Sequence, residues 1–112
     1  MTKEQLPTCT PDRWVMVKLT GPDGSNIEKL FFGGYGGYGG SDWWKINSGN
    51  TKVDEFPEHY DVYGVSGSLY RCYKQCYGMS GYMASVFQNF CENLPKEGAS
   101  IEILEQFAPQ NY

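Results

Sequence analysis

One segment of this 112-residue chain has a helical hydrophobic period, and it limits the folds that the remaining residues can adopt. Apolar side chains recur three and four positions apart from Met79 to Leu94, which predicts an amphipathic helix with one face on a core. Ser80 is placed to cap the first turn, and Pro95 with Gly98 to end the helix. A single helix of this kind needs a sheet to cover its apolar face.

The other ordered segments have the pattern of short strands joined by turns. From Arg13 to Thr20 one face of the predicted strand, with Val15, Val17 and Leu19, is apolar throughout, and Gly-Pro-Asp-Gly at 21–24 is typical of a turn before a returning strand. The segments predicted as strands are 13–20, 27–32, 43–46, 51–56, 60–65, 68–73 and 100–104, with a loose N-terminal arm at 1–12. We therefore expect residues 1–112 to form a single α+β domain, a mostly antiparallel sheet of about six short strands with the helix on one face.

Charge and hydropathy exclude several classes of partner. The formal net charge is −4, and the lysines and arginines stand singly, which disfavours binding to nucleic acid or to an anionic membrane. No apolar stretch approaches the ~18 residues that a membrane span needs, and the first residues lack an apolar signal core. The expected location is the cytoplasm.

The cysteines and the histidine are the residues from which a catalytic or metal site would be built. Cys72 and Cys76 have near-zinc spacing, but no second close pair follows and Cys9 and Cys91 stand alone, so we interpret all four as free thiols with no metal or cofactor. A metal site at Cys72 and Cys76 is the alternative. A cysteine nucleophile with His59 would need only spatial proximity, but no catalytic motif supports it, and we expect a protein without enzymatic activity.

The segment at 33–40 repeats Gly-Gly-Tyr, which predicts a loop or a sharply bent strand. It places Tyr35 and Tyr38 close in sequence to Trp43 and Trp44. Tyrosine and tryptophan dominate the energetics of many binding surfaces, so these four rings are our first candidate binding residues. The alternative is a packed bend in which the rings belong to the core.

The turn before the helix is the second candidate site. Tyr77 and Ser80 flank glycines at a predicted helix N-terminus, where free N–H groups favour anions, and Arg71 would add positive charge. Ordinary capping by Ser80 is the alternative. Several tyrosines of the second hairpin either line a groove or form a half-buried sheet face.

Four segments resemble small bacteriophage and prophage proteins that have no assigned activity. They are Asp-Arg-Trp-Val at 12–15, Ser-Asp-Trp-Trp-Lys-Ile-Asn-Ser-Gly at 41–49, Ser-Gly-Ser-Leu-Tyr at 66–70 and Tyr-Gly-Met-Ser-Gly-Tyr-Met at 77–83. The resemblance covers residues 12–90. The resemblance implies a biological context and no functional residue. Small acidic phage proteins often inhibit host or defence machinery.

Two functions remain open at this point. The first is a non-enzymatic binding protein, a phage-type inhibitor of a bacterial defence protein in the manner of an anti-CRISPR protein. The second is a protein that sequesters a nucleotide-like signalling molecule, with the base stacked on the four rings and the phosphate held by Arg71 and the turn at 78–81. Because free sheet edges are expected, we also predict a homodimer.

Overall fold

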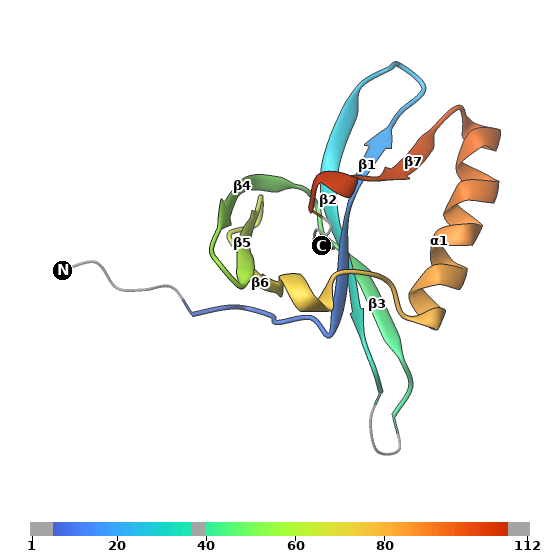
Figure 1. Ribbon diagram of the computed structural model, residues 1–112. Coiled ribbons are helices and arrows are strands. Elements are labelled where there is room, and N and C mark those ends of the chain that lie inside the picture. Colours follow the sequence, from blue (N-terminus) through green and yellow to red (C-terminus); the bar gives the residue numbers. More distant parts are fainter. Residues whose placement is uncertain (1–5, 37–39, 108–112) are drawn as a thin grey trace.

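A computed structural model describes residues 6–36 and 40–107 of the chain. In these ranges it contains seven strands, one α-helix and three short 3-10 helices (Figure 1). The elements are β1 (Arg13–Thr20), β2 (Asn26–Gly34), β3 (Trp43–Ile46), β4 (Asn50–Glu55), β5 (His59–Gly64), β6 (Leu69–Tyr73), η1 (Lys74–Cys76), α1 (Gly81–Asn93), η2 (Leu94–Glu97), β7 (Ser100–Ile103) and η3 (Glu105–Phe107).

The strands form two antiparallel sheets, one of four strands in the order β3-β2-β1-β7 and one of three in the order β4-β5-β6. Figure 1 shows α1 on one side of the four-stranded sheet and the three-stranded sheet on the other. The predicted α+β class with the helix on one sheet face is confirmed. The described part of the chain has seven strands rather than about six, and they are divided between two sheets.

Asn47 explains why the chain leaves the large sheet after β3. Its backbone N–H donates to the carbonyl of Leu30 at 3.0 Å, and its side-chain oxygen accepts from the Leu30 N–H at 2.8 Å. Asn47 thus satisfies both the backbone N–H and the backbone carbonyl of Leu30. The chain then turns at Gly49, whose φ of 136° lies in the region that favours glycine, and enters β4 of the small sheet.

Strand β1 is central to both layers of the core. Trp14 and Met16 face the small sheet, whereas Val15 and Val17 face the helix, and none of the four is more than 2% exposed. Successive residues of a strand point to opposite faces, so one strand supplies two cores. This arrangement requires apolar residues on both faces of β1.

The helix begins and ends where the sequence predicts. The hydroxyl of Ser80 accepts a hydrogen bond from the N–H of Met83 at 3.1 Å, which is the N-cap interaction. Pro95 stands in the first turn of η2, and Gly98 follows in the left-handed conformation with φ of 79°. Among the described residues, no helix is long and apolar enough to cross a membrane.

The N-terminal arm is held against the small sheet. The N–H of Thr8 donates to the carbonyl of Leu69 at 2.7 Å, and the N–H of Arg71 donates to the carbonyl of Cys9 at 3.1 Å. Cys9 and Tyr70 form a parallel bridge. The arm that we expected to be loose is therefore anchored at residues 8–9, because the edge of β6 offers backbone groups with which it pairs.

Candidate binding site

The glycine-tyrosine segment is divided between a strand and a loop. Gly33 and Gly34 end β2, and both are buried. Tyr35 follows with 52% of its surface exposed, and its hydroxyl accepts a hydrogen bond from Nε of Arg13 at 3.3 Å. Tyr38 lies outside the described residues. Of the predicted ring cluster, Tyr35 is thus the ring that the structure shows at the surface of the loop.

Trp43 and Trp44 are half-buried and belong to different layers. The Trp43 ring packs edge-on against Phe32 in the core below the small sheet, with 6.0 Å between centroids. The Trp44 ring packs against Phe31 and Phe90 beneath the helix, at 5.8 and 5.6 Å. Because the two indoles lie on opposite faces of β3, they do not form one stacking platform.

Tyr77 and Ser80 make contacts within the fold. The Tyr77 hydroxyl donates to the carbonyl of Leu104 at 3.2 Å, and its ring packs edge-on against Trp14 at 5.0 Å. Burial, and then the charge of Glu105, raise the pKa of Tyr77. The Ser80 hydroxyl serves the helix cap, as described above. No further feature at this helix end points to a bound anion in the part of the chain that the structure describes.

Arg71, the remaining predicted residue, lies in a partly buried ion pair on the outer face of the small sheet. Its Nε and Nη2 donate to Oδ1 and Oδ2 of Asp61, at 3.0 and 3.2 Å. The two residues are direct cross-strand partners of β5 and β6. The side chain of Asp61 is 6% exposed and that of Arg71 is 30% exposed. Such paired charge-assisted hydrogen bonds fix both side chains in orientation.

A row of three rings borders this ion pair. Phe56 stacks on His59 with centroids 4.8 Å apart, and His59 lies 5.5 Å from the ring of Tyr73. Nε2 of His59 is 3.4 Å from Oδ1 of Asp61, which ties the row to the ion pair. Phe56 is 41% exposed, and His59 and Tyr73 are partly exposed. We call Phe56, His59, Asp61, Arg71 and Tyr73 the outer site.

The outer site ends at a shallow hollow of about 250 Å³ lined by Glu58, Tyr73, Lys74 and Gln75. Lys74 crosses this region, with its Nζ 2.6 Å from Oε2 of Glu55 and 5.1 Å from the centroid of the Tyr60 ring. Its backbone N–H donates to the carbonyl of Glu58 at 2.9 Å. The hollow therefore presents charges of both signs beside an aromatic edge.

The catalytic pairing of Cys72 with His59 is not supported by this geometry. Cys72 pairs with Tyr60 across the ladder and lies in the core, whereas the adjacent register pair places His59 on the outer face. Burial, and then the nearby thiol of Cys9, raise the pKa of Cys72, and the thiolate is the reactive form. All four cysteines are free. In residues 6–36 and 40–107, no three His, Cys, Asp or Glu side chains are grouped as metal ligands.

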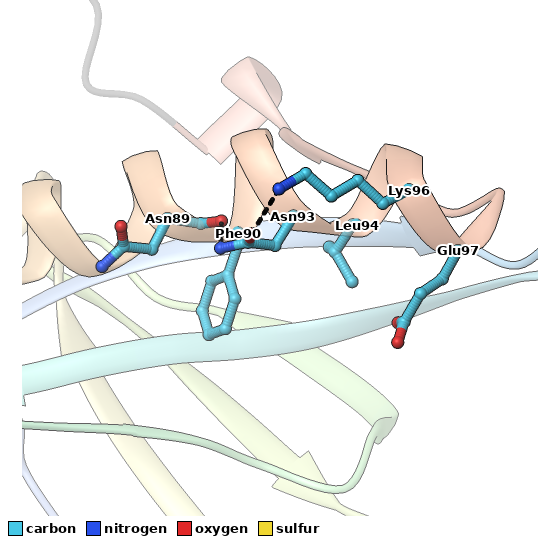
Figure 2. A pocket seen from close by; sticks show the side chains of 6 residues that line it. All are labelled: Asn89, Phe90, Asn93, Leu94, Lys96 and Glu97. Atoms are coloured by element: carbon cyan, nitrogen blue, oxygen red, sulfur yellow. Dashed lines mark hydrogen bonds between the residues drawn. The ribbon is translucent and has the colours of Figure 1, made fainter.

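A second hollow lies at the end of the helix. Figure 2 shows Phe90 and Leu94 pointing from α1 and η2 toward the sheet, with Asn89, Asn93, Lys96 and Glu97 around them. Its volume is about 420 Å³. Phe90 packs on Phe31 at 6.1 Å, so the apolar wall of this hollow is part of the helix–sheet core. On its polar rim the side-chain nitrogen of Asn93 donates to the carbonyl of Asn89 at 2.8 Å, and Nζ of Lys96 donates to Oδ1 of Asn93 at 3.4 Å.

Sequence reasoning found Arg71 but missed the residues that surround it. The opposite charges of Asp61 and Arg71 on the two strands of one predicted hairpin were a partial signal, and the register that pairs them came from the structure. Comparisons with protein-family models, with curated proteins and with solved structures found no match to the chain. The function is therefore inferred from the residues and their arrangement.

Proposed function

We propose that the chain is a non-enzymatic protein-binding module that uses the outer site to contact its partner. The observation that carries the proposal is the partly exposed row Phe56–His59–Tyr73, fixed beside the ion pair of Asp61 and Arg71. Aromatic residues and arginine are enriched among residues that dominate binding energies. Because strands and a partly buried ion pair hold these side chains, little side-chain entropy is lost on binding.

A protein partner fits the charges of the outer site better than a nucleotide does. The guanidinium of Arg71 is engaged by Asp61 in a paired interaction. Glu58 lines the adjacent hollow, where it would repel a phosphate. Neighbouring charges of both signs complement a protein surface, on which both signs are also present. Of the rings proposed for stacking a base, Trp43 and Trp44 lie in separate layers.

The more specific form of the proposal is an inhibitor of a bacterial defence protein that acts in the bacterial cytoplasm. Support comes from the resemblance of residues 12–90 to small phage proteins, from the acidic net charge of −4 and from four free cysteines, which suit a reducing compartment. This form predicts one stoichiometric protein partner in a bacterial lysate.

The test is capture from bacterial lysates with the immobilised chain and its variants. We expect wild type to retain a partner, and Phe56→Ala and Tyr73→Ala each to weaken its binding by about 2 kcal/mol, roughly 30-fold in Kd. Tyr82→Ala is the matched control, because Tyr82 is 44% exposed on α1, outside the outer site. A partner that is lost equally with all three variants, or a thermal stabilisation by nucleotides, contradicts the proposal.

A further inference from the structure

Strand β4 is an edge strand with backbone groups turned outward. In the described residues it pairs with β5 alone. The N–H of Phe56, just beyond β4, donates to the carbonyl of His59 on the β5 side at 2.8 Å. Backbone groups alternate in direction along an antiparallel strand, so those of Asp54 also face β5. The N–H and C=O of Val53 and Glu55 therefore face the open edge.

The side chains of this edge carry a self-complementary charge pattern. Lys52 and Asp54 flank Val53 and project from the same face, with Nζ and Oδ2 3.3 Å apart. Their side chains are 63% and 35% exposed. When a second copy runs antiparallel with its Val53 opposite this Val53, each Lys52 lies opposite the partner's Asp54. Opposite charges at directly facing positions stabilise such a pair.

We propose that the chain forms a two-fold symmetric dimer through β4, with Val53 opposite Val53 of the second copy. In this register the two Val53 residues exchange both of their outward backbone hydrogen bonds, as facing residues of a hydrogen-bonded antiparallel pair do. The two small sheets then form one continuous sheet, with three strands from each copy. The inference goes beyond the proposed function, since it assigns a partner to a different surface.

The charge pattern also selects against other registers. Because outward-facing groups alternate, one step away from the Val53 register puts either Lys52 opposite Lys52 or Asp54 opposite Asp54. Like charges at facing positions are unfavourable, so the Val53 register is favoured over both neighbouring registers. Charges on edge strands commonly prevent unspecific pairing, and here the same two charges permit one specific pairing.

The other edge strands of the described structure lack this property. Strand β3 carries Lys45 as its one charged residue, β6 carries Arg71 and β7 carries Glu102. When a strand with a single charged residue pairs with the same strand of a second copy, it cannot place opposite charges at facing positions. The choice of β4 therefore follows from the sequence of the edge and not from its exposure alone.

The dimer would present two outer sites together. A two-fold axis perpendicular to the continuous sheet keeps equivalent faces on the same side, so Phe56 and Tyr73 of both copies face one direction. Two linked sites bind a bivalent or oligomeric partner more tightly than one does. Dimer formation would thus strengthen the proposed binding without supplying any residue to the outer site.

The experiment measures the association state by sedimentation equilibrium over a wide range of protein concentration. Wild type is expected to dimerise. Lys52→Asp and Asp54→Lys each place like charges opposite one another, and each variant alone is expected to dimerise at least tenfold more weakly. An equimolar mixture of the two variants is expected to form a heterodimer, because all facing charges are again opposite. Lys18→Asp is the matched control, since it makes the same charge change on β1 and should dimerise as wild type does.

Several outcomes would overturn the proposal. They are a wild-type chain that stays monomeric at every concentration, a Lys52→Asp variant that dimerises as tightly as wild type, and a mixture of the two reversed variants that does not associate. Circular dichroism of each variant shows that a loss of dimer is not a loss of fold. Lys52 does not belong to the outer site, so binding of a protein partner to monomeric Lys52→Asp tests the proposed function separately.

Discussion

Asp61 faces Arg71 across the β5–β6 ladder, and its carboxylate accepts hydrogen bonds from Nε and Nη2 of the guanidinium at 3.0 and 3.2 Å. Since the Asp61 side chain is 6% exposed, Arg71→Ala would leave a buried carboxylate without its main partner. We expect this variant to lose about 3 kcal/mol of unfolding free energy, measured by urea denaturation. Lys18→Ala, which breaks the exposed pair with Glu102, should lose less than about 1 kcal/mol. Equal losses at both positions would contradict the assigned role of burial.

The register of this hairpin shows where the sequence was insufficient. The predicted strands at 60–65 and 68–73 leave a two-residue loop at Ser66 and Gly67, which would place Asp61 opposite Cys72. The N–H of Gly64 instead donates to the carbonyl of Ser68, and Gly67 takes a φ of 92°. The loop is one residue longer, so Asp61 faces Arg71. Loop length in hairpins depends on local turn geometry, and Ser-Gly is compatible with both.

Local sequence patterns were sufficient to predict the helix, because its hydrophobic period, its N-cap and the residues that end it all lie within one segment. The division into two sheets was not visible, because it depends on a long-range interaction. Asn47 completes the pairing of Leu30, seventeen positions earlier, and lets the chain leave β3. Trp43 and Trp44 were similarly ambiguous. Their sequence resembles an exposed aromatic cluster. In the structure both are half-buried, because the core of the small sheet covers the Trp43 face of β3 and the core beneath the helix covers the Trp44 face.

The stability of the fold should decrease in alkaline solution through Cys72. Burial raises the pKa of this thiol above its ordinary value of 9.0, so the folded chain keeps the proton while the unfolded chain releases it. The thiol contributes its full stability below pH 9.0 and loses it as the pH rises from there toward the folded pKa. The expected slope from this residue is about 1.4 kcal/mol per pH unit. Urea unfolding between neutral and alkaline pH should show a shallower slope for Cys72→Ala than for wild type, and identical slopes would contradict the assignment.

Two glycines should respond in opposite directions to substitution by alanine. A Cβ at Gly33 would overlap the backbone carbonyl oxygen of Trp43 and lie 3.0 Å from Sδ of Met83. Overpacking of this kind costs about 1–3 kcal/mol, so Gly33→Ala should be destabilised. A Cβ at Gly81, in the first turn of α1, meets no atom within 4 Å, and alanine is favoured over glycine in helices by up to about 1 kcal/mol. Thermal unfolding of both variants measures the difference, and a stabilised Gly33→Ala variant would show that β3 can move away from β2.

The rings around the glycine-tyrosine segment should separate into a surface residue and a core residue. Tyr35 is 52% exposed and its side chain makes one hydrogen bond, with Arg13, so Tyr35→Ala should change the unfolding free energy by no more than about 0.5 kcal/mol. Trp44 packs against Phe31 and Phe90 beneath the helix, and Trp44→Ala should cost about 3 kcal/mol, at the lower end of the range for large aromatic residues because the ring is half-buried.

Phe87→Ala is the reference for Trp44→Ala, since Phe87 stacks on the same Phe31 ring from the helix side at 6.5 Å. Urea midpoints of the three variants test the arrangement together. Similar losses for Trp44→Ala and Phe87→Ala, with little change for Tyr35→Ala, are expected if Phe31 joins the sheet and the helix into one core. A Trp44→Ala variant as stable as wild type would instead mean that the indole contributes nothing to that core. In that case Trp44 would return to the surface residues available for binding, together with Tyr35.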